Sequence, residues 1–166
     1  QGMISLADFR AALREDTILV SVMSVNNEVG TIYPVADIGR EILKWRKKYT
    51  TKYPLFHTDA CQAANLLDIN VERSHVYLMT VNGSKIYGPK GVGMLYKRRG
   101  IELEPISFGG GQEFGLRSGT ENVAGIVGFA EALDFVNENR GEKYVKLKGL
   151  QEMLWNGIKE KISGVT

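Results

Sequence analysis

The chain has 166 residues, of which 43% are hydrophobic, and its formal net charge is +2. This length suffices for one domain with a real core, burying on the order of 70% of the unfolded surface. The nearly balanced charge gives no reason to expect nucleic acid or an anionic membrane as a partner. One cysteine excludes an internal disulfide, and no apolar run approaches the roughly 20 residues that span a bilayer. Because the start also lacks the regions of a signal peptide, we expect a soluble, cytoplasmic protein.

Apolar residues recur in patterns that predict alternating helices and strands along the chain. Helices are expected over residues 6–14, 36–49, 121–136 and 145–162, with a further short helix after residue 62. Strands are expected over residues 17–24, 54–58, 75–80 and 92–97. Ser5 has the position of an N-cap for the first helix. Strands and helices that alternate with short links predict an α/β fold, with a mainly parallel sheet flanked by helices.

Three polar residues follow directly on the ends of predicted strands, namely Asn27, Asp59 and Lys85. The sites of parallel sheets form at the carboxyl ends of strands, so these residues are expected to meet at one edge of the sheet. Each also has an ordinary structural interpretation. Asn27 suits a polar turn, Asp59 suits a helix N-cap, and Lys85 suits a solvated loop.

Other motifs carry weaker indications of function. The lysines and arginine at residues 44–48 are typical of a solvated helix face. The three glycines at 109–111 lack the Gly-Lys-Ser/Thr ending of a nucleotide-binding loop. Residues 117–120, Arg-Ser-Gly-Thr, stand at a predicted helix start and suit anion binding. His57 is interpreted as a packed or structural residue, and Cys61 as a small buried hydrophobe.

Residues 81–91 read Val-Asn-Gly-Ser-Lys-Ile-Tyr-Gly-Pro-Lys-Gly. This stretch resembles the cofactor-lysine loop of the cysteine desulfurases, pyridoxal phosphate (PLP) enzymes of the class V aminotransferase family. The usual form in that family is Ser-Gly-His-Lys-Ile-Tyr-Gly-Pro-Lys-Gly. Three further family motifs occur in the family's order, at residues 26–30, 57–62 and 117–120. The resemblance therefore covers nearly the whole chain.

The resemblance implies a fold and a set of cofactor contacts. The fold is part of the large domain of a fold-type I PLP-dependent transferase. Lys85 matches the lysine that binds PLP covalently, and Asp59 the aspartate that pairs with the protonated pyridine nitrogen. Gln62 matches a residue that hydrogen-bonds the phenolic oxygen of PLP. Asn27 matches an asparagine beside the cofactor and the substrate carboxylate.

The residues expected to hold the cofactor phosphate depart from the family pattern. Asn82 stands where the family usually has serine, and Ser84 where it usually has histidine. An amide and a hydroxyl still donate hydrogen bonds, but with less assistance from charge. Thr120 matches a threonine that reaches the phosphate bound by the other subunit, which implies a homodimer. Gln112 and Phe114 replace the usual histidine and arginine of the preceding loop.

The resemblance also implies an activity and a division of the chain. The parent protein is expected to convert L-cysteine to alanine and to pass the sulfur to an enzyme cysteine outside this chain. A sulfur-accepting scaffold protein for iron–sulfur assembly is the expected partner, and no metal site is predicted. Residues 1–140 are expected in the PLP-binding large domain, and residues 141–166 in a helix leading towards the small domain. The chain reads as a central fragment that is inactive alone.

Two alternative functions remain open on the sequence. A selenocysteine lyase or another class V aminotransferase shares the same motifs. A catalytically silent fragment or an interaction subunit is consistent with the changes at Asn82 and Ser84. It is also consistent with the absence from this sequence of the loop that carries the family's persulfide cysteine.

Overall fold

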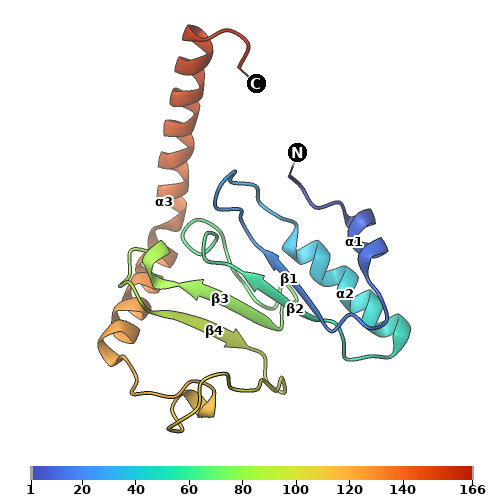
Figure 1. The fold of residues 1–166 in the computed structure, drawn as a ribbon. Helices are drawn as coiled ribbons and strands as arrows, with labels where there is room; N and C mark the ends of the chain where they lie inside the picture. Colours follow the sequence, from blue (N-terminus) through green and yellow to red (C-terminus); the bar gives the residue numbers. More distant parts are fainter. Residues whose placement is uncertain (1, 166) are drawn as a thin grey trace.

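The computed structural model describes residues 2–165, and its centre is a four-stranded sheet in the order β1-β2-β3-β4. The strands are β1 (Leu19–Met23), β2 (Leu55–Asp59), β3 (Leu78–Asn82) and β4 (Gly93–Lys97). Strands β1, β2 and β3 are parallel, and β4 pairs antiparallel with β3. The expected mainly parallel α/β sheet is therefore confirmed (Figure 1).

Helices α1 (Leu6–Ala12), α2 (Val35–Tyr49) and α3 (Val123–Lys161) flank the sheet, with two short 3-10 turns, η1 (Gly83–Lys85) and η2 (Glu113–Gly115). Figure 1 shows α1 and α2 beside β1 and β2, whereas α3 passes the loop after β3 and then projects away from the sheet. Within the described residues, no helix is long and apolar enough to cross a membrane.

The helices predicted over residues 121–136 and 145–162 form one continuous helix, α3. Helix α3 continues for 39 residues through the stretch 137–144, where a gap between two helices was expected. Most residues of this stretch are compatible with a helix, and its single Gly141 costs only about 1 kcal/mol relative to alanine. Asn122 begins α3, because its side-chain oxygen accepts a hydrogen bond from the Gly125 amide at 3.1 Å.

The short helix predicted after residue 62 is wrong. Residues 61–66 form turns, in which the amides of Ala63 and Ala64 both donate to the Ala60 carbonyl at 3.0 Å. All three alanines are buried and belong to the hydrophobic core. Their burial holds the backbone against the core, so tertiary packing rather than a regular helix decides this segment.

Strand β3 begins and ends later than predicted, at Leu78–Asn82 rather than 75–80. His75 has a positive φ of 54°, which is incompatible with an extended strand. At the other end, Val81 and Asn82 pair with Met94 and Gly93 of β4. The strand therefore extends almost to the Lys85 turn.

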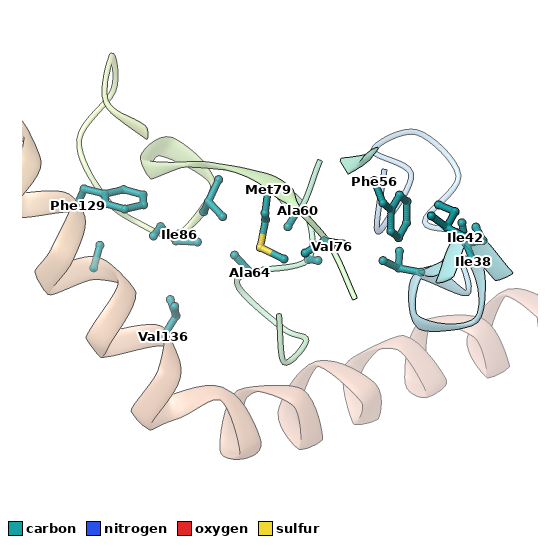
Figure 2. Packing of buried hydrophobic residues seen from close by; sticks show 14 residues of the cluster. Ile38, Ile42, Phe56, Ala60, Ala64, Val76, Met79, Ile86, Phe129 and Val136 are labelled. Atoms are coloured by element: carbon teal, nitrogen blue, oxygen red, sulfur yellow. The ribbon is translucent and has the colours of Figure 1, made fainter. Parts of the chain in front are cut away.

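The hydrophobic core is a continuous row from α2 across the sheet to α3 (Figure 2). Its members are Val35, Ile38, Ile42, Phe56, Ala60, Ala63, Ala64, Val76, Met79, Val81, Ile86, Phe129, Ala132 and Val136. Ile86, at 0% exposure, brings the loop after β3 into this row. The loop that carries Lys85 is therefore anchored in the core of the protein.

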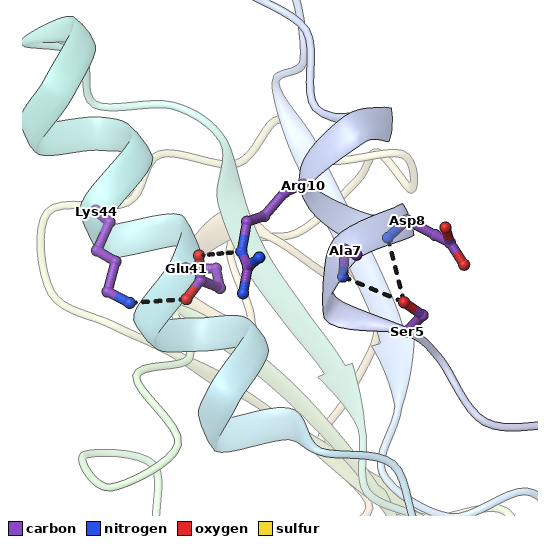
Figure 3. Close-up of polar contacts among 6 residues, drawn as sticks. All are labelled: Ser5, Ala7, Asp8, Arg10, Glu41 and Lys44. Carbon is purple, nitrogen blue, oxygen red and sulfur yellow. Dashed lines mark hydrogen bonds and ion pairs between the residues drawn. The ribbon is translucent and has the colours of Figure 1, made fainter.

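Polar contacts fix α1 against α2 (Figure 3). Ser5 is the N-cap of α1, as predicted, and its hydroxyl accepts from the Ala7 and Asp8 amides at 3.2 and 3.4 Å. Glu41 of α2 accepts from Arg10 and from Lys44, both at 2.8 Å. These two cations hold the pKa of Glu41 below its ordinary value, with Lys44 the larger cause.

The basic cluster of α2 divides into two kinds of residue. Lys44, Lys47 and Lys48 are exposed, as expected for a solvated face. Arg46 is half-buried instead, and its guanidinium carbon lies 4.5 Å from the centre of the Tyr77 ring. Its charge is therefore part of a stacking contact with the segment before β3.

Candidate functional site

The candidate site lies at the carboxyl ends of three neighbouring parallel strands. The register pairs Met23 of β1 with Asp59 of β2, and Asp59 with Thr80 of β3. Backbone hydrogen bonds continue this alignment past the strand ends. The Ser24 amide donates to the Asp59 carbonyl at 2.7 Å, and the Ala60 amide donates to the Thr80 carbonyl at 2.9 Å. The segments that carry Asn27, Asp59 and Lys85 therefore leave the sheet at one edge, as predicted.

Lys85 is the last residue of η1, and its side chain is exposed. Asn82 caps this turn, because its side-chain oxygen accepts from both the amide and the hydroxyl of Ser84 at 2.8 Å. The Gly83 carbonyl then accepts from the amides of Ile86 and Gly88 at 3.1 and 2.9 Å. The predicted position of Lys85 on a connection between two strands is confirmed.

Asp59 ends β2 and is half-buried. Its carboxylate accepts a hydrogen bond from the Cys61 amide at 2.9 Å, so it caps the turn that replaces the predicted helix. Gln62, in the same turn, is also half-buried. Asp59 is a cap, as its structural interpretation predicts, although it caps turns rather than a helix. Its half-buried carboxylate lies at the end of β2.

Cys61 is a poor nucleophile in this setting. Burial and the neighbouring Asp59 carboxylate raise the pKa of its thiol to about 11. Its sulfur lies 4.0 Å from the Thr80 carbonyl oxygen. Because a thiolate is the reactive form of cysteine, Cys61 is almost fully protonated and weakly reactive near neutral pH. Cys61 is half-buried rather than fully buried, so its interpretation as a small buried hydrophobe is only partly correct.

His57 lies on the sheet between its neighbours in β1 and β3. Its Nδ1 is 2.8 Å from the Ser21 hydroxyl, and its Nε2 is 3.4 Å from the Thr80 hydroxyl. Burial lowers the pKa of His57 below its ordinary value of 6.5, and the charge of Asp59 opposes this in part. The neutral ring is therefore a structural bridge across three strands.

The two asparagines after β1 differ in their surroundings. The side-chain oxygen of Asn26 accepts from the amides of Glu28 and Val29, both at 2.9 Å, which forms the polar turn expected for this motif. Asn27 is exposed beside it. Asn26 therefore shapes the turn that carries Asn27, four residues after the end of β1.

Thr120 lies on the segment that leads from β4 into α3. Since β4 is antiparallel, its carboxyl end lies at the opposite edge of the sheet, and the chain returns to α3 through the segment around η2 (Figure 1). Thr120 is exposed, two residues before the Asn122 cap of α3. Arg117 of the same motif donates to the carbonyls of Ser118 and Gly119 at 3.3 and 2.9 Å. The predicted position of this motif at a helix start is confirmed.

Sequence patterns did not reveal how closely α3 packs on the Lys85 loop. A Cβ added at Gly83 would lie 3.1 Å from the Phe129 ring, and one added at Gly88 would lie 3.2 Å from the Ala132 Cβ. A Cβ added at Gly128 would lie 2.8 Å from the Pro89 ring. The glycines of the motif signalled a tight turn, but nothing in the pattern identified the helix some forty residues later as its support.

Comparisons with known proteins agree with this geometry. The family model for aminotransferase class-V matches residues 1–163. A cysteine desulfurase IscS of Clostridium botulinum is 44% identical over 165 residues, covering 99% of this chain and 40% of the relative. A mitochondrial cysteine desulfurase of Arabidopsis thaliana is 46% identical over 166 residues, covering 99% of this chain and 35% of the relative.

A solved structure described as a NifS-like protein superposes with a TM-score of 0.89 and 41% identity, covering 96% of this chain and 42% of the other. The chain thus spans about 40% of the length of the curated relatives it matches. The match to the family model extends over almost all of its residues. The chain belongs to the class V aminotransferase family.

Proposed function

We propose that the chain is the central part of a PLP-dependent cysteine desulfurase, which converts L-cysteine to L-alanine and supplies sulfur for iron–sulfur assembly. The observation that carries this proposal is the arrangement of Asn27, Asp59 and Lys85 at adjoining ends of three parallel strands. Residues 1–140 belong to the PLP-binding large domain in this proposal, and residues 141–166 lead towards the small domain.

The donor set at the strand ends fits PLP. Lys85 offers an exposed primary amine, and Asp59 a half-buried carboxylate on the neighbouring strand. Asn82 keeps its amide nitrogen as a donor towards an anion, whereas the Ser84 proton is engaged by the Asn82 oxygen. The amine and the carboxylate therefore fit well, and the phosphate contacts depend more on neutral donors than in the usual family pattern.

Each residue of the site has a defined task. Lys85 would hold the cofactor through its amine, and the same amine would move protons as a general base. Asp59 would hold a proton on the pyridine nitrogen, and Gln62 and Asn27 would orient the ring and the substrate. Bound PLP supplies an electron sink that weakens the carbon–sulfur bond of the substrate.

The sulfur acceptor is a cysteine outside this chain. The attacking thiolate forms an S–S bond with the substrate sulfur as the carbon–sulfur bond breaks. The carbon keeps the electron pair and gains a proton, so the products are alanine and an enzyme persulfide. Cys61 does not suit this step, because its thiol has a pKa of about 11 and it lies in the turn after Asp59. A sulfur-accepting scaffold protein then receives the sulfur.

A homodimer completes the phosphate site in this proposal. Thr120 and Arg117 are exposed just before the start of α3. In this proposal, Thr120 serves the phosphate site of the second subunit. A cytoplasmic location is also proposed, and fractionation tests it, since one relative is named a mitochondrial enzyme.

Borohydride reduction after incubation with PLP tests the central assignment. Peptide mass mapping of the full-length protein is expected to find a pyridoxyl adduct on Lys85. Lys85→Ala removes the adduct, whereas Lys90→Ala, at an exposed lysine of the same loop, retains it. Absence of any adduct from the full-length protein contradicts the proposal and favours a catalytically silent protein.

Product analysis separates the desulfurase from its nearest alternatives. Alanine and sulfide from cysteine support the proposal. Selenide formed in strong preference to sulfide indicates a selenocysteine lyase, and transfer of the amino group to a keto acid indicates an aminotransferase. The silent alternative draws support from the hydrogen bond that the Ser84 hydroxyl donates to Asn82, because it occupies a proton that could bind phosphate. Turnover by the complete protein excludes this alternative.

A further inference from the structure

Three side chains join the Lys85 loop to two other segments of the chain. Lys143 of α3 lies with its Nζ 3.8 Å from the centre of the Tyr87 ring. The same ammonium donates a hydrogen bond to the side-chain oxygen of Asn65, in the turns that follow Asp59. Asn65, Tyr87 and Lys143, which we term the Tyr87 cluster, thus connect the segments after β2 and β3 with α3.

The backbone of Tyr87 needs external support. Its φ of 67° is a left-handed conformation that residues other than glycine rarely adopt. The residue before it, Ile86, is fully buried, and Gly88 after it packs closely on Ala132. Tyr87 itself is 65% exposed, so burial does not hold its side chain. Contacts with α3 provide the restraint, through Lys143 and an edge-on Phe135 ring at 6.4 Å.

The charge of Lys143 is directed at this loop. Within residues 2–165 it forms no ion pair with a carboxylate, although it is half-buried. Its partners are the Tyr87 ring and the Asn65 amide oxygen, and both lie near the candidate site rather than along α3. Lys143 and Asn65 lower the pKa of the Tyr87 hydroxyl below its ordinary value, consistent with their proximity. Because the Lys143 ammonium lies over the Tyr87 ring and also binds Asn65, it restrains both the loop after β3 and the turns after β2.

We propose that the Tyr87 cluster positions the Lys85 amine, by holding residues 83–88 in one conformation against α3 and the turn after Asp59. Tyr87, Lys143 and Asn65 are positioning residues, since none of them touches the reacting atoms. The part of this inference that concerns the chemistry of Lys85 rests on the proposed function. The part that concerns the order of the loop does not.

Amide hydrogen exchange of the full-length protein without added PLP tests the order of the loop. The amides of Ile86 and Gly88, which donate to the Gly83 carbonyl, report on it directly. Lys143→Met is expected to accelerate their exchange at least tenfold. Lys146→Met, at an exposed lysine of the same helix, is the matched control and leaves exchange unchanged. Lys143→Arg keeps the cation and the hydrogen-bond donor, so the Ile86 and Gly88 amides are expected to exchange as slowly as in the native protein.

Asn65→Ala provides a second test that leaves α3 intact. It removes only the amide partner of Lys143, so a several-fold acceleration confined to residues 83–88 is expected. Unchanged exchange in both Lys143→Met and Asn65→Ala overturns the proposal. Acceleration that spreads equally over β1 and β2 also overturns it, because it indicates a general loss of stability rather than a local restraint.

Cofactor spectra test the consequence for Lys85. With PLP bound, the pH midpoint of the visible absorption change is expected to shift in Lys143→Met, not in Lys146→Met, and to recover in Lys143→Arg. An unshifted midpoint contradicts the positioning role. The two failures are distinguishable: faster loop exchange without any pyridoxyl adduct supports the restraint and refutes the proposed function, whereas an adduct with unchanged exchange refutes the restraint.

Discussion

Two loops that adjoin α3 are built in opposite ways. The Lys85 loop, residues 82–92, has Ile86 at 0% exposure and two glycines packed against the helix. The glycine-rich segment, residues 106–120, has Phe108 at 83% and Phe114 at 100% exposure. Its polar contacts are largely internal, such as the Ser107 and Ser118 hydroxyls at 2.9 Å. The first loop takes its conformation from the core of the chain, whereas the second has little of the described chain to pack on.

This difference separates the two halves of the proposed site. The amine and the carboxylate lie on elements that the chain orders by itself, which suits groups that require accurate placement. The anion-binding motif lies on a segment whose apolar side chains remain uncovered by the described residues. A second subunit, as proposed, supplies a surface for that segment.

Phenylalanine truncation gives the largest expected contrast between the loops. Phe129→Ala is expected to lower the free energy of unfolding by about 3–5 kcal/mol, because it leaves a cavity beneath the Lys85 loop. Phe114→Ala is expected to change it by less than about 0.5 kcal/mol, since the ring is fully exposed. Urea denaturation measures both. A large cost at Phe114 would break the comparison by showing that another surface covers the glycine-rich segment.

Glycine substitution sharpens the same comparison with a smaller change. A Cβ added at Gly83 would lie 2.9 and 3.0 Å from the carbonyl oxygens of Pro89 and Val92, so Gly83→Ala forces backbone movement. We expect a cost of about 2–3 kcal/mol. Gly111→Ala is the matched control, because a Cβ there meets nothing within 4 Å. Its expected effect is within about 0.5 kcal/mol. Equal unfolding temperatures for Gly83→Ala and Gly111→Ala would show that the Lys85 loop accommodates the added methyl group without cost.

Thiol reactivity compares the turn after Asp59, which belongs to the half of the site that the chain orders by itself, with the glycine-rich segment. The pKa of Cys61 is raised from an ordinary 9.0 to about 11, so its thiolate fraction at neutral pH is about 100-fold below that of an unperturbed thiol. Iodoacetamide is expected to alkylate it about 100-fold more slowly than a cysteine placed at exposed Thr120 by Thr120→Cys in a Cys61→Ala background. Comparable rates at the two positions would refute the protected setting of Cys61.

The pH dependence of stability gives the smallest expected effect. Burial lowers the folded-state pKa of His57 below 6.5. Above pH 6.5 the ring is neutral in both states, and its contribution to stability is fully present. As the pH falls, the unfolded state binds a proton first, and the contribution is lost towards the folded-state pKa. Urea midpoints at pH 7.5 and 5.5 should therefore differ more in the native protein than in His57→Gln, and equal differences in both would contradict this.

Local patterns were sufficient for the core of the site. Runs of β-branched and apolar residues located the strands, and the rule for parallel sheets placed Asn27, Asp59 and Lys85 at one edge. Helix boundaries were harder to predict. Residues 137–144 carry few apolar side chains, so the pattern appeared to end, whereas compatible helix propensity lets α3 continue.

Contacts between distant residues had no signal in the sequence. Asn65 and Lys143 are 78 residues apart, and neither belongs to a motif. The lysines around Arg46 predict a solvated face, but the fold places the Tyr77 ring against its guanidinium group. Both cases involve a charged side chain whose partner comes from another element.

The sequence by itself determined the alternation of strands and helices, the sheet edge near which the candidate residues lie, and the family of the chain, because these depend on periodicity and on short motifs. Only the tertiary structure decided that a helix beginning at Val123 supports the loop of Lys85, and that Asp59 caps turns rather than a helix. The physical reason is that close packing and buried hydrogen bonds depend on which surfaces meet, and the order of residues along the chain does not specify those meetings locally.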